Sequence, residues 1–402
     1  MGPILRRAHG PGSPFRRRRI LGALLAALSA TSAYAQGWSF RPVFTVGVGY
    51  DSNITFTPGD LSPGDYFGGA GFRAPLSGRL SRNTSLSASY SANCEWYQDF
   101  KGFDACPSRH TASLGLSHAP GENTTLSIGA AFSESRRPED VFPVSGIDFL
   151  RGKTQNLGAS ANLGHRLGRR TSLGVGYTYS RPLYEPLEGL ERRAEGHSAN
   201  ASLTRELGRE SSVFLRYTYQ LYLREDASND SSHAVGLGFS RALGRGTTLS
   251  LAGEALFVGG DVQVQPQGTI SLGHAWRSSR VSLSYSRSRN YVLTTQGFTE
   301  TDSIGASYSI GLRRFQLGAS AGYSRNRLEG EGDPVDLGRR FGTYRGSLDA
   351  AYMLARWLGA GATYQYSWQD ASTQALDERR RHIAQVGFVI APWSNRKAEG
   401  LR

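Results

Sequence analysis

The sequence has few cysteines and few long apolar runs. Two of its 402 residues are cysteine, and hydrophobic residues make up only 39%. No run beyond the N-terminal region approaches the roughly 20 continuous apolar residues of a membrane-spanning helix. A helical membrane protein is therefore excluded. A membrane β-barrel is not, because only every second residue of a barrel strand must be apolar.

Motifs for catalysis and metal binding are also missing. The chain contains no His-Glu-x-x-His, Gly-x-Ser-x-Gly or Walker-type loop. Its eight histidines are scattered singly, without the spacing of metal ligands. Serine is so common that a chance Ser–His pair carries no information. We therefore predict no enzyme activity, no metal site and no other cofactor.

The N-terminus has the features of a secretory signal peptide. Four arginines at residues 16–19 precede the apolar stretch ILGALLAALSA, and the small residues at 33–35 form a cleavage site. We expect residues 1–35 to be removed. This segment holds six arginines and no acidic residue, so the net charge falls from +13 to +7. Such a mildly basic chain gives little support to nucleic-acid binding.

The remaining sequence alternates between apolar and polar residues. In SSVFLRYTYQLYLRE, residues 211–225, Leu215, Tyr217 and Tyr219 fall on one face of an extended chain and Arg216 and Thr218 on the other. Period-two alternation over this length indicates a β-strand. A soluble sandwich would bury the Leu/Tyr face, whereas a membrane barrel would turn it to lipid and the Arg face to water.

Hairpins recur along the chain. Eight short turns, three of them with Leu-Gly-Arg, alternate with longer polar connectors. The expected strands begin near Arg41, Asp65, Thr84, Arg109, Thr124, Gly152, Thr171, Glu195, Ser211, Asn229, Thr247, Gln263, Arg280, Thr299, Arg313, Arg340, Arg356 and Glu378. Short turns that alternate with long loops are typical of outer-membrane barrels. The sequence therefore predicts an all-β fold, a single antiparallel up-and-down transmembrane β-barrel of about 18 strands (16–18) over residues 36–393. Both termini would be periplasmic, and residues 394–402 form a polar tail.

Small polar residues on the second face of the strands favour the membrane interpretation. One strand places Ser85, Ser87, Ser89, Ser91 and Asn93 opposite its apolar face, and such a face suits a water-filled lumen. By the same parity, we predict six larger polar or charged side chains in the lumen: Glu95, Arg216, Gln220, Arg224, Glu254 and Asp349. They would either bind a polar ligand or pair with one another across the lumen.

Cys94 and Cys106 flank a segment that has the composition of a loop tip. In a hairpin whose paired positions sum to 200, the two cysteines face each other, as do Ala88 and Ala112, and Leu86 and Leu114. Exported proteins form disulfides readily. The spacing therefore predicts a disulfide that closes this loop, with two free thiols as the alternative.

Tyr-Ser-Arg occurs three times near the end of a strand, at residues 179–181, 285–287 and 323–325. Aromatic residues favour the membrane interface, and the arginine of each triplet shares the outward face of its tyrosine. Five arginines follow this pattern: Arg181, Arg287, Arg289, Arg325 and Arg327. They are predicted to bind lipopolysaccharide phosphates or, equally, to extend into solvated headgroup space.

The first expected strand, RPVFTVGVGYDSNITF, carries Tyr50, Asp51, Ser52 and Asn53. This motif resembles the opening of a family of outer-membrane β-barrel porins that often accompany exopolysaccharide loci. Asp51 and Asn53 would face inward or serve as a capping and turn device. The last expected strand, RHIAQVGFVIAPW, resembles the C-terminal signal for barrel-insertion machinery, although Pro392 and a polar tail stand where a terminal aromatic is usual.

The resemblance implies an integral protein in the outer membrane of a Gram-negative bacterium that takes part in exopolysaccharide export. It also implies periplasmic polysaccharide-export proteins as partners. The barrel, the outward arginines and the last strand separately predict outer-membrane lipid, lipopolysaccharide and the barrel-insertion machinery as partners, with polysaccharide or small polar solutes in the lumen and no nucleic acid. Two alternatives remain open. One is a passive diffusion porin for sugars or small polar solutes, and the other is a structural or adhesive barrel with a closed lumen.

Overall fold

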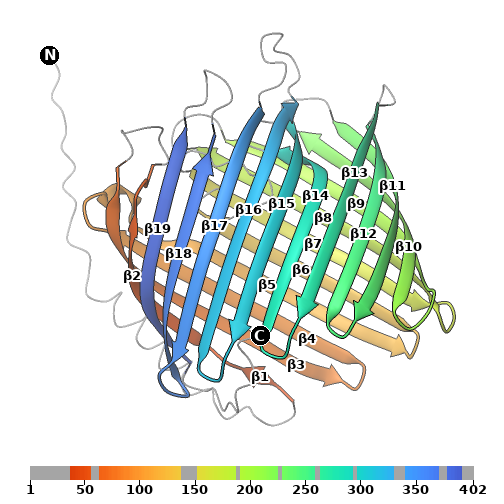
Figure 1. Ribbon diagram of the computed structural model, residues 1–402, viewed down its shortest axis with the longest axis horizontal. Coiled ribbons are helices and arrows are strands. Elements are labelled where there is room, and N and C mark those ends of the chain that lie inside the picture. Colours follow the sequence, from red (N-terminus) through yellow and green to blue (C-terminus); the bar gives the residue numbers. More distant parts are fainter. Residues whose placement is uncertain are drawn as a thin grey trace, which may run out of the picture.

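The computed structural model describes residues 37–55, 63–136, 152–186, 191–224, 229–258, 263–292, 297–329, 340–370 and 378–391. Strands β2–β19 form one closed antiparallel barrel, in which each strand pairs with the next and β19 returns to β2 (Figure 1). The predicted fold class is confirmed. The predicted signal peptide and C-terminal tail lie outside the described residues.

The strands are β1 (Ser39–Phe40), β2 (Val43–Asp51), β3 (Asp65–Ser81), β4 (Thr84–Tyr97), β5 (Ala105–Gly121), β6 (Thr124–Ser135), β7 (Gly152–Arg166), β8 (Thr171–Pro186), β9 (Arg192–Glu206), β10 (Ser211–Arg224), β11 (Asp230–Gly244), β12 (Thr247–Val258), β13 (Gln263–Ala275), β14 (Ser279–Val292), β15 (Gly297–Gly311), β16 (Phe315–Glu329), β17 (Arg340–Met353), β18 (Leu358–Gln369) and β19 (Arg379–Ile390). A short 3₁₀ helix, η3 (Lys101–Phe103), follows β4. Across the described ranges, no helix is long and apolar enough to cross a membrane.

The strand starts agree with the sequence prediction to within four residues. The largest difference is at β5, which begins at Ala105 instead of near Arg109. The connections at one end of the barrel, here called the turn end, are short, and those at the other end, the loop end, are longer. The described chain enters the barrel in β2 and leaves it in β19 at the turn end, as the predicted even strand number requires.

The short strand β1 continues the line of β2. Ser39 pairs with Ser77 of β3, and Val43 of β2 pairs with Arg73 in the same register. Between the two strands stands Pro42, which has no N–H to donate to a sheet. One strand is therefore divided into two by a proline.

Large apolar side chains point outward along the wall. Leu215 is 47% exposed and Leu237 is 68% exposed, and many valines, isoleucines and tyrosines on other strands are similarly accessible. The opposite face carries hydroxyl pairs between neighbouring strands, such as Ser89 with Ser113 and Ser282 with Ser307, both at 2.7 Å. A closed sheet with an apolar exterior and a polar interior is suited to lipid outside and water inside. The protein is therefore an integral β-barrel of a membrane.

The predicted disulfide between Cys94 and Cys106 is present, with a Cα–Cα distance of 4.3 Å. The predicted register of this hairpin was wrong in its body, where Ala88 faces Leu114 and Leu86 faces Leu116. An irregularity between Asn93 and Glu95 shifts the pairing by two residues before it reaches the cysteines. A shift of two keeps every side chain on its own face, so the alternation could not reveal it.

Candidate lumenal site

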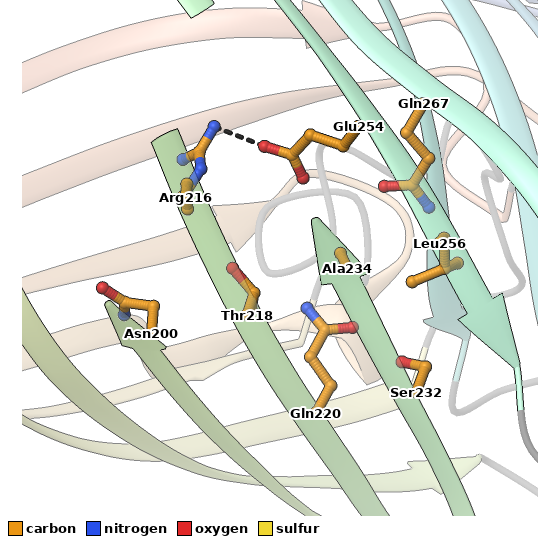
Figure 2. A pocket seen from close by; sticks show the side chains of 9 residues that line it. All are labelled: Asn200, Arg216, Thr218, Gln220, Ser232, Ala234, Glu254, Leu256 and Gln267. Atoms are coloured by element: carbon orange, nitrogen blue, oxygen red, sulfur yellow. Dashed lines mark ion pairs between the residues drawn. The ribbon is translucent and has the colours of Figure 1, made fainter. Parts of the chain in front are cut away.

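An inward row of residues crosses four neighbouring strands. Arg216 of β10 pairs with Gly236 of β11, Gly236 with Glu254 of β12, and Glu254 with Gln267 of β13. A Cβ atom on Gly236 would lie 2.4 Å from Cγ of Glu254. Because glycine lacks that atom, the Glu254 side chain lies across β11 and its Oε1 comes within 2.5 Å of Nη2 of Arg216 (Figure 2).

This ion pair lies in a cavity of about 330 Å³ on the inner wall of β9–β13. The cavity is lined by Asn200, Arg216, Thr218, Gln220, Ser232, Ala234, Glu254, Leu256 and Gln267. Figure 2 shows their side chains projecting from adjacent strands into one space. Amide, hydroxyl and charged groups together can donate and accept hydrogen bonds, which is the chemistry that sugar hydroxyls require.

One polar atom of the cavity is unsatisfied. Nε of Arg216 is buried and has no hydrogen-bond partner among the described residues. A buried donor without a partner costs about 1–3 kcal/mol, which an acceptor could relieve only after the Arg216 side chain moves, because Nε itself is shielded from contact.

The structure brings three of the six predicted lumenal residues together. Arg216, Gln220 and Glu254 line the cavity, whereas Glu95 lies on β4 and accepts a hydrogen bond from the Tyr97 hydroxyl at 3.3 Å. The other two are on separate parts of the wall. Arg224 of β10 pairs with Ala194 of β9 near the loop end, and Asp349 of β17 pairs with Gly318 of β16 and with Thr363 of β18.

The Tyr-Asp-Ser-Asn motif closes the seam between the first and last barrel strands. Asp51 is fully buried and receives two hydrogen bonds from Arg381 of β19, Nε to Oδ1 at 2.9 Å and Nη2 to Oδ2 at 2.6 Å. The backbone N–H of Asn53 donates to Asp51 at 3.1 Å, and Nδ2 of Asn53 donates to the Arg380 carbonyl at 3.0 Å. The Ser52 hydroxyl accepts the backbone N–H of His382.

The turn-device interpretation of Asp51 and Asn53 describes this arrangement well, because the first hydrogen bond links a side chain to the backbone two residues on. The contribution of Arg381 was missed. No local pattern could have revealed it, since Asp51 and Arg381 are 330 residues apart in the sequence.

A group of residues meets inside the barrel near the loop end. The ring of Tyr222 on β10 lies 5.5 Å from that of Tyr291 on β14 and 5.6 Å from that of Phe298 on β15. Tyr291 also packs against Tyr184 of β8 and Ala194 of β9. Neither β14 nor β15 is a sheet neighbour of β8, β9 or β10, so the contacts between the two groups cross the lumen and narrow its mouth.

Arg289 joins this group instead of the predicted outward row. Its side chain is 9% exposed, its guanidinium lies 3.6 Å from the ring centre of Phe298, and its Nη1 is 3.7 Å from Oδ1 of Asp230 on β11. We call Tyr184, Ala194, Tyr222, Asp230, Arg289, Tyr291 and Phe298 the cross-lumen cluster. The position of Arg289 follows from the inward lean of β14, which strand alternation does not encode.

The other four arginines of the outward row have acidic neighbours. Nε of Arg181 is 3.5 Å from Glu195, and Arg287 forms ion pairs with Glu300 and Asp302. On the next strand, Arg325 stands opposite Asp302 and Arg327 opposite Glu300 in the register of β15 and β16. The arginines of β14–β16 are therefore part of a mixed-charge patch.

Histidines form a pattern that was not predicted. On the outer face, the hydroxyls of Tyr177, Tyr217 and Tyr364 each lie 2.7 Å from Nδ1 of a histidine on the next strand. The three histidines are His197, His233 and His382. Near the turn end, Thr84, Thr124 and Thr247 contact His118, His165 and His274 in the same way. The Tyr-x-Tyr sequence that begins at each of these three tyrosines was the signal from which the Tyr–His pairs could have been predicted. The described residues contain no cluster of three metal-ligand side chains.

No family model matches the sequence, and no curated protein matches it at a significant level. Among solved structures, the FrpB iron transporter from Neisseria meningitidis (F5-1 variant, apoprotein form) has 10% identity and a TM-score of 0.48, with 91% of this chain and 82% of that chain covered. OccAB4 from Acinetobacter baumannii has 11% identity and a TM-score of 0.45, with coverages of 89% and 99%. The siderophore receptor PirA from Pseudomonas aeruginosa has 10% identity and a TM-score of 0.44, with coverages of 87% and 80%. Such low similarity carries no argument about this chain, and the fold rests on its own strand pairing.

Proposed function

We propose that this barrel lies in the outer membrane of a Gram-negative bacterium and takes part in the export of exopolysaccharide through its lumen. The observation that carries the proposal is the chemistry of the inner wall. Hydroxyl pairs such as Ser91–Thr111, Ser286–Ser303 and Ser320–Ser347 line it on several sides. Such a wall exchanges hydrogen bonds with sugar hydroxyls without strongly retaining ions.

Several sequence features support the same proposal. The predicted signal peptide directs the chain out of the cytoplasm, and the last strand resembles an insertion signal for an outer-membrane barrel. The Tyr50–Asn53 motif resembles a porin family associated with exopolysaccharide loci. Export in that setting would involve periplasmic polysaccharide-export proteins at the turn end. It is a transport role and needs no enzyme activity or cofactor.

The test compares polymer export with solute uptake in a deletion strain. Secreted and surface polysaccharide is measured beside the uptake of small sugars in the same cells. Polymer lost, or retained in the periplasm, with uptake unchanged would support export. Complementing the deletion strain with the variants Arg216→Gln, Glu254→Gln and Asp349→Asn would then show which of these residues line the path of the polymer. Polymer unchanged with slower uptake would contradict export and leave a passive diffusion porin.

Two alternatives have their own support. The 330 Å³ cavity beside Arg216 is of a size that suits a small polar solute, which favours a diffusion porin for sugars. The cross-lumen cluster favours a structural or adhesive barrel with a closed lumen. Conductance in a planar bilayer separates these cases, because a closed barrel passes no steady ion current.

Lipopolysaccharide is a proposed partner of the outward arginines. Arg181, Arg287, Arg325 and Arg327 would place guanidinium groups at the level of the lipid phosphates, where Arg–phosphate pairs are favourable. The carboxylates of Glu195, Glu300 and Asp302 weaken this attraction. The double variant Arg287→Ala/Arg325→Ala would retain less lipopolysaccharide through purification than the wild-type protein. Unchanged retention would indicate that the arginines only extend into solvent.

A further inference from the structure

The wall of the barrel divides between β13 and β14. Their ladder runs from Ala275–Arg280 at the turn end to Gly268–Arg287 and ends there. Both strands continue beyond this point, since β13 pairs with β12 up to Gln263 and β14 pairs with β15 up to Val292. Residues 263–267 and 288–292 therefore border an opening in the wall, and Figure 1 shows the two strands diverging towards the loop end.

Two local features account for this separation. The first is Pro266 on the β13 border, because proline has no N–H for a ladder and occurs in sheets mainly where a strand has a free edge. The second is the inward lean of β14 and β15, which the cross-lumen cluster holds. Tyr291 of β14 packs on Tyr184 of β8, and Arg289 of β14 forms an ion pair with Asp230 of β11.

The opening begins where the outer face of β14 changes from apolar to charged residues, which is the pattern expected at the lipid headgroups. Along the outer face of β14, the apolar residues Leu283 and Tyr285 are followed by Arg287, where the ladder ends. Backbone groups that leave a ladder need water or another polar partner and are not tolerated in hydrocarbon. The borders carry polar residues at alternate positions, Gln265 and Gln267 on one side and Ser288 and Asn290 on the other, whereas Val264 on β13 is 55% exposed.

The polar cavity lies directly behind this opening. Gln267, the residue next to the last paired position of β13, also lines the cavity with Glu254 and Arg216. Ser232 and Leu256, further along the inner wall of the cavity, are buried. The cavity and the opening are thus contiguous through Gln267.

We propose that the gap between β13 and β14 is a side window through which the saccharide part of an outer-leaflet glycolipid reaches the cavity and binds beside Arg216 and Glu254. Two observations support it: the ladder ends where the outer face of β14 changes from apolar to charged, and Gln267 belongs both to the border of the opening and to the lining of the cavity. The inference rests on the outer-membrane location but not on polymer export, and it would hold for a barrel that carries other polar solutes.

The first experiment tests the window by disulfide formation. Continuing the register of the ladder would place Gln265 opposite Asn290, so Gln265→Cys/Asn290→Cys probes the opening. The matched control is Thr269→Cys/Ser286→Cys on the same two strands, a pair that the ladder already joins. With a mild oxidant, the control pair should form a disulfide several-fold faster than the window pair. Equal rates would show that β13 and β14 remain paired beyond Gly268 and Arg287, and would overturn the proposal.

The second experiment tests the ligand by photocrosslinking in native outer membranes. A benzophenone maleimide is attached to Gln267→Cys, with Thr111→Cys on the inner face of β5 as the control. Native Cys94 and Cys106 are bonded and do not react. Illumination should attach lipopolysaccharide to the Gln267 site several-fold more than to the control. Equal or absent attachment would overturn the proposed binding.

The choice of host strain distinguishes the two possible sources of the saccharide, which are the glycolipid of the membrane and the exported polymer. In cells that make no exopolysaccharide, the crosslink at Gln267 should persist, because its source is the glycolipid of the membrane. A crosslink that disappears in this strain would show that the cavity holds the exported polymer. It would refute the side window as a route for glycolipid while leaving the export role intact.

Discussion

Glu254 on β12 forms an ion pair with Arg216 on β10 across the full width of the strand between them. The intervening residue is Gly236, and the lack of a side chain there lets the carboxylate pass over β11. The pair sets two opposite charges at one position of the inner wall. This arrangement balances the local charge of the lumen. Removing either charge alone should therefore alter the flow of ions.

Neutralising one member of this pair should change the ion selectivity in opposite directions. Glu254→Gln leaves the Arg216 cation unpaired and shifts the lumen towards anions, whereas Arg216→Gln leaves a carboxylate and shifts it towards cations. The measurement is the reversal potential across a bilayer in a salt gradient. Shifts of the same sign in both variants would mean that the pair does not border the conducting path.

Gly236→Ala should break the pair without changing any charge. The new Cβ would lie 2.4 Å from Cγ of Glu254, so that side chain must move. Because the pair is partly exposed, its coupling free energy is about 0.5–1 kcal/mol, and it should fall to near zero in this background. A double-mutant cycle with Arg216→Gln and Glu254→Gln, read by urea unfolding, measures the coupling. Gly253→Ala is the control, because its Cβ would meet nothing within 4 Å.

Asp51→Asn should destabilise the barrel at its seam. Asp51 and Arg381 are both buried, and removing one partner of such a pair costs about 3–5 kcal/mol. Urea unfolding of the folded barrel in detergent gives the free energy of unfolding. Glu378→Gln removes the exposed partner of Arg380 and should cost less than about 1 kcal/mol. Similar losses in both variants would mean that the seam does not depend on the buried pair.

Tyr291→Ala should increase conductance. The tyrosine ring lies against Tyr222 and Tyr184 inside the loop end, so its removal takes bulk out of the narrowed mouth. Tyr308→Ala, on the outer face of the neighbouring β15, removes the same ring without touching the lumen. Single-channel currents of the two variants should therefore differ. Equal conductance would place the limiting constriction elsewhere along the pore.

The local alternation of the sequence determined much of this protein. The number of strands, their starts to within four residues and the outward direction of Leu215 and Tyr217 follow from the sequence. These features are predictable because a side-chain period of two is a property of each strand by itself. The positions of the short turns then set which strands are neighbours.

Contacts between distant strands were decided only by the tertiary structure. The partner of Asp51, the inward position of Arg289 and the division of the wall at Gly268 depend on where β19 closes and on how far β14 leans. The shift in the β4–β5 register belongs to the same class, since a slip of two residues leaves every side chain on its own face. Alternation along a strand specifies a face, whereas the distance across a lumen depends on the curvature of the whole closed sheet.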